Sequence, residues 1–208
     1  PGDVVFRSEQ LELIQYRPQT RNVRGTPLFI VPPQINKYYV WDLAPGRSLV
    51  EFLVQQGFQV FMVSWRNPTA EQADWGLQSY VLSLEDAMRV TRDIARSPQV
   101  HLLGACSGGI TSAALLAYLA TKGSDWARSL TLLVSVLDID TISDSSMGLF
   151  VNLETLDIAR TLSGARGVLK GKDLAKVFAW LRPNDLIFNY WVNNYLLGKK
   201  APAFDVLY

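Results

Sequence analysis

The chain has 208 residues, with 20 basic and 19 acidic side chains, one His, one Cys and a hydrophobic content of 49%. A zinc site built from Cys and His needs about four ligands and a disulfide needs a second Cys, so the sequence predicts neither, and we expect no metal and no cofactor. A net charge of +1 lacks the basic excess typical of nucleic-acid-binding proteins, and the composition is that of a globular domain with a sizeable core.

The most apolar stretch of the chain, residues 110–120, is interrupted by Thr111 and Ser112 and falls short of the ~20 residues that cross a bilayer. The first residues show no charged segment leading into an apolar one, so no signal peptide is predicted. We therefore expect a cytoplasmic protein without a transmembrane segment. Because the chain does not begin with Met and ends at Tyr208 without a polar tail, we also expect it to be part of a longer protein.

The first half of the chain alternates between strand and helix patterns. Residues 4–7 and 11–16 predict an antiparallel hairpin at a sheet edge. Apolar runs without alternation predict strands buried on both faces, at 27–31, 60–65, 100–103 and 130–137. Helix patterns lie between them, at 49–56 with Ser48 as cap, 80–95 and 110–122. The strand starts recur every ~30–40 residues, the length of a βαβ unit, which predicts a parallel, doubly wound α/β sheet.

The last third of the chain differs in composition from the rest. Residues 139–208 contain no convincing buried strand but many aromatic residues, with helix patterns at 153–161, 172–181 and 185–197. A segment inserted after a central strand would cover the carboxyl ends of the strands, where α/β sheets bind ligands. We interpret it as a cap or lid, with ordinary helices completing the sheet as the alternative. The predicted domains are an α/β core over 1–138 and a cap over 139–208.

One motif carries chemistry. Residues 100–110, Val-His-Leu-Leu-Gly-Ala-Cys-Ser-Gly-Gly-Ile, fit the nucleophile elbow Gly-x-Ser-x-Gly, with Cys106 in place of Ser. Gly104 and Gly108 are expected where a Cβ would collide with the neighbouring strand and helix. Cys106 would lie at a helix N-terminus, which favours the thiolate, and the Ser107 N–H would face a forming oxyanion. An inert core cysteine is the alternative.

A second candidate element is the loop after the first parallel strand, which begins with Pro32 and Pro33. In α/β hydrolases this loop supplies the other N–H of the oxyanion hole. Because the two prolines have no N–H to donate, the Gln34 and Ile35 amides are the candidates. A loop stiffened for folding reasons is an equal alternative at this stage.

Taken together, several segments of the chain resemble the polyhydroxyalkanoate synthases. In chain order they are Pro-Pro-Gln-Ile-Asn-Lys-Tyr-Tyr (32–39), Val-Ser-Trp-Arg-Asn-Pro (63–68), Gly-Ala-Cys-Ser-Gly-Gly (104–109), Leu-Arg-Pro-Asn-Asp-Leu (181–186) and Asn-Tyr-Trp-Val-Asn-Asn-Tyr (189–195). Ala105 and Ser107 are more similar to the pseudomonad class II enzymes, which favour medium-chain substrates. The resemblance implies the α/β-hydrolase fold, of which this chain would form the N-terminal part of the sheet and the start of a helical cap.

The resemblance also implies an activity. The family polymerises (R)-3-hydroxyacyl-CoA into polyhydroxyalkanoate and releases CoA, using a Cys-His-Asp triad and a covalent acyl-Cys intermediate. Cys106 matches the nucleophile, and we expect the Ser107 and Ile35 amides to hold the oxyanion. The implied partners are the acyl-CoA substrate, the growing polyester, a second copy in a homodimer and the surface of intracellular polyhydroxyalkanoate granules.

The chain departs from the family because the triad His and Asp lie after the cap and have no match here. The rest of the core is therefore expected to be missing, and the 208-residue chain to be inactive alone. His101 is interpreted as a core or strand-end histidine. Asp138 is expected to end the strand after the nucleophile helix, a position some α/β hydrolases use for the acid, with capping of the next segment as the alternative. Asn184 and Asp185 are interpreted as helix caps.

Two other functions stay open from the sequence. One is a cysteine hydrolase of the dienelactone-hydrolase kind, in which water replaces the acyl acceptor. The other is a catalytically incomplete chain that acts as a binding or dimerisation module. The elbow does not separate acyl transfer from hydrolysis, whereas the family motifs and the predicted cap favour acyl transfer.

Overall fold

The structure is a computed structural model of the chain, and it describes residues 2–35, 37–138, 140, 157, 160–161, 164, 167–168, 171 and 187–200. The chain divides into two compact units. One consists of Pro1–Pro68 and Asp74–Leu137, and the other of Thr69–Ala73 and Asp138–Tyr208. All the strands described below belong to the first unit, which therefore carries the sheet.

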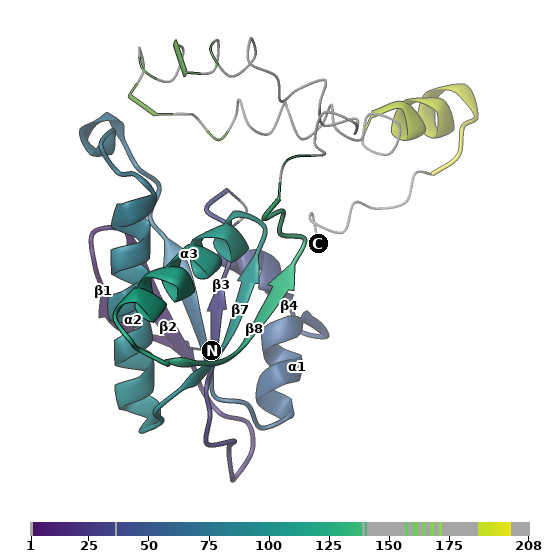
Figure 1. Cartoon of the computed structure of the whole chain (residues 1–208). Helices are drawn as coiled ribbons and strands as arrows, with labels where there is room; N and C mark the ends of the chain where they lie inside the picture. Colours follow the sequence, from purple (N-terminus) through teal and green to yellow (C-terminus); the bar gives the residue numbers. More distant parts are fainter. Residues whose placement is uncertain are drawn as a thin grey trace. The chain divides into compact units, whose positions relative to one another are not determined.

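A six-stranded mixed sheet organises the first unit (Figure 1). Its strands are β1 (Gly2–Arg7), β2 (Leu11–Tyr16), β3 (Leu28–Val31), β6 (Val60–Trp65), β7 (Val100–Ala105) and β8 (Ala127–Leu133). They lie in the order β1-β2-β6-β3-β7-β8. The pairs β1–β2 and β2–β6 are antiparallel, and the pairs β6–β3, β3–β7 and β7–β8 are parallel. The predicted edge hairpin and parallel sheet are therefore confirmed.

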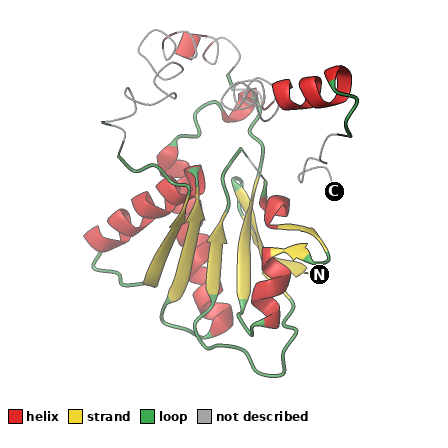
Figure 2. Ribbon diagram, turned by 90° about the vertical axis from the view of Figure 1, so that its right-hand side faces the viewer, coloured by secondary structure: helices red, strands yellow, loops and turns green. Residues whose placement is uncertain are grey.

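Helices cover both faces of this sheet, as Figure 2 shows. They are α1 (Leu49–Gln55), α2 (Leu77–Ala95) and α3 (Ser107–Thr121). Shorter elements of this unit are the 3₁₀ turn η1 (Tyr38–Trp41) and a small two-stranded sheet of β4 (Asp42–Ala44) and β5 (Arg47–Ser48); the 3₁₀ turn η2 (Ala70–Gln72) belongs to the second unit. Consecutive parallel strands are joined through helices, with α1 on one face of the sheet and α2 and α3 on the other, so the unit is a doubly wound α/β layer structure.

The core follows from the period-two alternation of the central strands. Phe61 and Val63 of β6 pack in a cluster with side chains of α2 and α3. Val60 and Met62 of the same strand point the other way, into a cluster with Val50 and its neighbours on α1. A strand that buries both faces has no polar face to show, so its sequence is continuously apolar. This confirms the interpretation of residues 60–65.

The helix ends agree with the capping residues in the sequence. Ser48 Oγ accepts the Glu51 N–H at 2.8 Å and caps α1. Gly57 follows this helix with a φ of 79°, a conformation that costs glycine little. The helix α3 begins three residues earlier than the predicted start at Ile110, because Cys106 occupies its N-cap position.

The predicted strand over 130–137 is wrong in its bounds and its burial. The observed strand β8 spans Ala127–Leu133 and is half-buried at its best positions, with most of its residues exposed. Val134 then leaves the extended conformation with a φ of 45°. The apolar run 130–137 was expected to be covered on both faces, but within the described residues β8 pairs with β7 alone and forms the sheet edge.

In the second unit, the described segment 187–196 is helical and includes a π-helix, η6 (Trp191–Leu196). It falls within the helix predicted for 185–197. Most of the window 153–161 and all of the window 172–181 lie outside the described residues, so they stay predictions, as does the role of 139–208 as a cap. Within the described part of the chain, no helix is both long and apolar enough to cross a membrane.

Candidate active site

The turn between β7 and α3 holds Cys106 in a backbone conformation that residues other than glycine rarely adopt. Its φ is 51° and its ψ is −123°. Such a backbone costs about 1–3 kcal/mol and persists only where neighbours enforce it. Here the Cys106 N–H donates to the Leu133 carbonyl oxygen at 2.9 Å, and the Cys106 carbonyl oxygen accepts the Gly109 N–H at 3.0 Å and the Ile110 N–H at 3.3 Å. Both sides of the strained residue are therefore tied to β8 and α3.

Two glycines allow this turn to pack tightly. A Cβ on Gly104 would lie 2.6 Å from the Gly109 Cα, and a Cβ on Gly108 would lie 2.3 Å from the Val31 carbonyl oxygen and 2.5 Å from that of Pro32. No real side chain fits at such distances. Glycine at position 104 therefore lets the first turn of α3 approach β7, and glycine at position 108 lets it approach the end of β3.

The N-terminus of α3 presents one of the two expected oxyanion donors. Ser107 is the first residue of the helix, and its N–H has no acceptor in the described part of the chain. An unpaired amide at a helix N-terminus is suited to stabilise negative charge. It belongs to the residue directly after Cys106, where an oxyanion hole needs one donor.

The other donor was expected from Gln34 or Ile35. The Gln34 N–H is occupied, because it donates to Ser107 Oγ at 3.2 Å. The Ile35 N–H has no acceptor among the described residues, and the Ile35 side chain is exposed. Of the two amides, the geometry leaves that of Ile35 available.

The Gln34 side chain extends this contact along α3. Its Nε2 donates to Thr111 Oγ1 at 3.0 Å, and the Thr111 hydroxyl donates in turn to the Ser107 carbonyl oxygen at 2.8 Å. The Gln34 Oε1 atom is buried and has no partner in the described residues. A buried acceptor without a donor costs about 1–3 kcal/mol. The observed orientation of the Gln34 side chain therefore costs stability, because it leaves this oxygen unpaired.

Sequence reasoning missed two residues that hold this loop. The buried Trp65 indole N–H donates to the Pro32 carbonyl oxygen at 2.7 Å. Lys37 Nζ donates to the Trp65 carbonyl oxygen at 3.3 Å and to the Asn67 side chain. Burial lowers the pKa of Lys37 below its ordinary value. Trp65 lies at the carboxyl end of a buried parallel strand, and that position was the available signal, since such strand ends surround ligand sites.

His101 lies far from Cys106. It is the second residue of β7, so the five residues to Cys106 span about 16 Å of extended strand. Its Nδ1 is 2.7 Å from Ser129 Oγ on β8, its partner in register. The imidazole therefore contacts Ser129 near the amino end of β7, whereas Cys106 follows the carboxyl end of that strand.

Asp138 does not end the strand that follows the nucleophile helix, as the sequence had suggested. It comes five residues after the last residue of β8 and is exposed, because the strand stops at Leu133. Its Oδ1 accepts the Asp140 N–H at 3.0 Å, which is the local capping contact that was the alternative. Asn184 and Asp185 lie outside the described residues.

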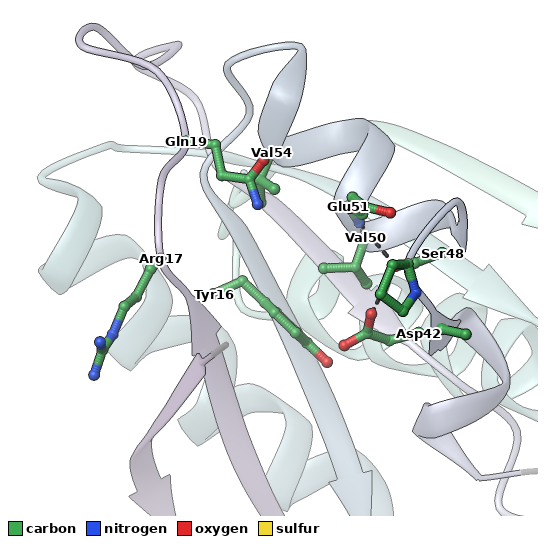
Figure 3. A pocket seen from close by; sticks show the side chains of 10 residues that line it. Tyr16, Arg17, Gln19, Asp42, Ser48, Val50, Glu51 and Val54 are labelled. Atoms are coloured by element: carbon green, nitrogen blue, oxygen red, sulfur yellow. Dashed lines mark hydrogen bonds between the residues drawn. The ribbon is translucent and has the colours of Figure 1, made fainter.

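A separate pocket of about 190 Å³ lies between the end of β2, the small β4–β5 sheet and α1 (Figure 3). Tyr16 lines it at the end of β2, next to the start of β6. Its hydroxyl points toward Asp42, and burial together with the Asp42 carboxylate raises the pKa of Tyr16 well above its ordinary value. The pocket does not include Cys106. Within the described residues, no group of three or more His, Cys, Asp or Glu side chains gathers in a way that could hold a metal ion.

The strand order, the parallel crossovers and a cysteine on a strained strand-to-helix turn define the first unit as an α/β-hydrolase core, with Cys106 at the position where that fold carries its nucleophile elbow. Solved α/β hydrolases are similar to it. One example is the Bacillus licheniformis lipase BlEst2, with a TM-score of 0.48, 12% sequence identity, and coverage of 74% of this chain and 66% of that protein.

Sequence comparison is more specific. Residues 1–53 match the family model described as poly-beta-hydroxybutyrate polymerase (PhaC) N-terminus. The whole chain is 52% identical to poly(3-hydroxyalkanoate) polymerase 1 of Ectopseudomonas oleovorans and spans 37% of that protein. It is 43% identical, again over its whole length, to the polymerase subunit PhaC of Cupriavidus necator and spans 36% of it. The chain is therefore similar over its whole length to poly(3-hydroxyalkanoate) polymerases, more so to the Ectopseudomonas protein than to the Cupriavidus protein, and it spans little more than a third of either.

Proposed function

We propose that this chain carries the nucleophile and the oxyanion donors of an acyltransferase that polymerises (R)-3-hydroxyacyl-CoA into polyhydroxyalkanoate. The observation that carries the proposal is Cys106 on the elbow, next to an unpaired Ser107 amide, in a chain 52% identical to a named poly(3-hydroxyalkanoate) polymerase. A nucleophile with adjacent amide donors is the arrangement that acyl transfer needs.

The proposed reaction has two half-steps. The Cys106 thiolate attacks the thioester carbonyl, the new sulfur–carbon bond forms, and the bond to the CoA sulfur breaks so that CoA leaves. The amides of Ser107 and Ile35 stabilise the oxyanion of the tetrahedral intermediate. The 3-hydroxyl of another acyl unit then loses its proton to a base and attacks the acyl-Cys106 thioester, which forms the ester bond, breaks the bond to the Cys106 sulfur and releases the thiolate for the next cycle.

A sulfur nucleophile suits this sequence of steps. Exchange of one thioester for another is nearly isoenergetic, so the acyl group on Cys106 stays available to the hydroxyl acceptor. Water must be excluded, because hydrolysis would end the polymer. We assign this exclusion to residues 139–208, whose described part exposes Phe188, Trp191 and Tyr195.

The one histidine of this chain does not act as the general base in the proposed reaction. This residue, His101, is at the wrong end of β7 and contacts Ser129. In the proposed enzyme the base and its acid partner come from outside these 208 residues. We further propose that the complete enzyme works in the cytoplasm as a homodimer on the surface of polyhydroxyalkanoate granules.

The test uses the full-length protein that contains this chain, supplied with (R)-3-hydroxydecanoyl-CoA. CoA release is followed with a thiol reagent, and the products are separated into polymer and free acid. We expect continuous CoA release, polymer as product, and an acyl adduct on Cys106 in the mass spectrum of quenched enzyme. A Cys106→Ala variant should show none of the three.

Two outcomes would contradict the proposal. Continuous CoA release with free 3-hydroxydecanoic acid as the product would make the protein a cysteine hydrolase. Activity retained in Cys106→Ala would remove the covalent mechanism.

A further inference from the structure

We propose that Gln34 is a positioning residue that holds the Ile35 amide in the oxyanion hole by fixing the loop after β3 to the first turn of α3. The inference rests on the proposed acyl transfer and concerns how one of its two oxyanion donors, the Ile35 amide, is held in place. Gln34 contacts α3 twice, once with its backbone N–H and once with its side chain.

These two contacts fix the peptide group that carries the Ile35 N–H. The Gln34 N–H donates to Ser107 Oγ at 3.2 Å, which holds one side of the residue beside the nucleophile. The Gln34 Nε2 donates to Thr111 Oγ1 at 3.0 Å, one helical turn further along. Ile35 follows directly, so its amide is set by the anchored residue before it.

The bond from Thr111 to Ser107 determines which way the Gln34 amide faces. The Thr111 hydroxyl donates its single proton to the Ser107 carbonyl oxygen at 2.8 Å, so it can only accept a hydrogen bond from Gln34. This places Nε2 against Thr111 and leaves Oε1 buried without a donor. An apolar side chain of the same size would avoid the unpaired buried oxygen and would stabilise the fold better. The presence of Gln34 here therefore favours a role in positioning.

Neighbouring contacts hold the loop from the other side. The Trp65 indole N–H holds the Pro32 carbonyl oxygen, and Lys37 Nζ holds the Trp65 carbonyl oxygen. Between these anchors on β6 and the two anchors on α3, the Gln34–Ile35 peptide is held at both ends. Removal of the Gln34 side chain would loosen only the contact on the α3 side.

The experiment compares Gln34→Met with wild type in the full-length protein. Methionine keeps the length of the side chain but lacks its amide. We expect the maximal rate of CoA release from (R)-3-hydroxydecanoyl-CoA to fall about 10- to 100-fold, with KM unchanged, because the oxyanion exists only in the transition state and the intermediate. The melting temperature should stay within about 4 °C of wild type.

Alkylation of Cys106 by iodoacetamide provides a second measurement. Alkylation displaces iodide from a tetrahedral carbon and forms no oxyanion, so its rate should be the same in wild type and in Gln34→Met. A merely structural defect at the elbow would slow both reactions.

Matched variants sharpen the comparison. Thr111→Val removes the hydroxyl that accepts from Gln34 and should lower CoA release in the same way, whereas Thr111→Ser keeps the hydroxyl and should recover most of the rate. Gln55→Met changes an exposed glutamine on α1 and serves as the control for the substitution itself.

Wild-type CoA release in Gln34→Met would overturn the inference while leaving the proposed function intact. Equal losses of CoA release and alkylation would also overturn it, because they would indicate damage to the nucleophile. Absence of CoA release from wild type would instead contradict the proposed function, and the inference would fall with it.

Discussion

Gly108 and Val31 lie so close that a single methyl group cannot fit between them: a Cβ on Gly108 would be 2.3 Å from the Val31 carbonyl oxygen. This contact brings the first turn of α3 onto the end of β3. The strand end that leads into the Ile35 loop and the helix that follows Cys106 are thereby placed side by side.

Gly108→Ala should therefore separate α3 from β3. The added methyl group meets backbone atoms, which cannot rotate away, so we expect a loss of about 1–3 kcal/mol in the free energy of unfolding and about 100-fold lower CoA release. Urea unfolding and the thiol assay on the full-length protein measure the two effects. Gly25→Ala is the control, because a Cβ there meets nothing within 4 Å; equal behaviour of the two variants would refute the steric argument.

Trp65→Phe should destabilise the loop after β3. The substitution keeps an aromatic ring but leaves the buried Pro32 carbonyl oxygen without its donor, at a cost of about 1–3 kcal/mol. The free energy of unfolding in urea measures the loss. Trp75→Phe is the control, since the half-buried Trp75 ring packs edge-on against Tyr80 and its indole N–H has no acceptor in the described residues. A control loss as large as that of Trp65→Phe would show that the hydrogen bond contributes nothing specific.

Tyr16→Phe should change how stability depends on alkaline pH. Burial and the Asp42 carboxylate raise the pKa of Tyr16 in the folded state, whereas the unfolded chain has a tyrosine pKa of about 10. The protonated Tyr16 side chain makes its full contribution to the free energy of unfolding below about pH 10. This contribution is lost as the pH rises toward and through the folded pKa, because the unfolded state then binds fewer protons than the folded state. Between pH 9 and about 11, wild type should lose more stability than Tyr16→Phe. The urea midpoint at each pH tests this, with the exposed Tyr195→Phe as control; parallel pH curves for wild type and Tyr16→Phe would count against it.

The 208-residue chain on its own should release at most one equivalent of CoA. Cys106 and the Ser107 amide are present, but His101 is about 16 Å of strand away from Cys106. General-base assistance typically contributes about 10²–10⁴-fold, so turnover without a base should be negligible. The purified chain, (R)-3-hydroxydecanoyl-CoA and a Cys106→Ala control are sufficient. Multiple turnovers above that control would mean that another residue of this chain acts as the base.

Replacing the exposed aromatics of the second unit should admit water to the proposed active site. Phe188, Trp191 and Tyr195 are 48%, 54% and 79% exposed. If residues 139–208 form the proposed lid, changing these three residues to Ser in the full-length protein should raise the ratio of free 3-hydroxydecanoic acid to polymer. Phe52→Ser, on the exposed face of α1, is the control. An unchanged product ratio would show that these side chains do not exclude water.

The sequence by itself determined the local elements of this protein. The strand over 60–65 and the Ser48 cap follow from apolar runs, turn glycines and capping side chains within a few residues of one another. The strand-turn-helix form of the elbow follows in the same way, because Gly104 and Gly108 flank Cys106 in the chain. Such patterns act over short distances, so they can be read without knowing the fold.

Only the tertiary structure decided which distant residues meet. Pro32 and Trp65 are 33 residues apart, and Gln34 and Thr111 are 77 residues apart, yet each pair forms a hydrogen bond beside the elbow. The exposure of β8 was decided in the same way, because the burial of a strand depends on what packs against it and not on its own composition. The sheet order places β6, β3 and β7 side by side at the centre of the sheet, and no local pattern in the sequence specifies that order.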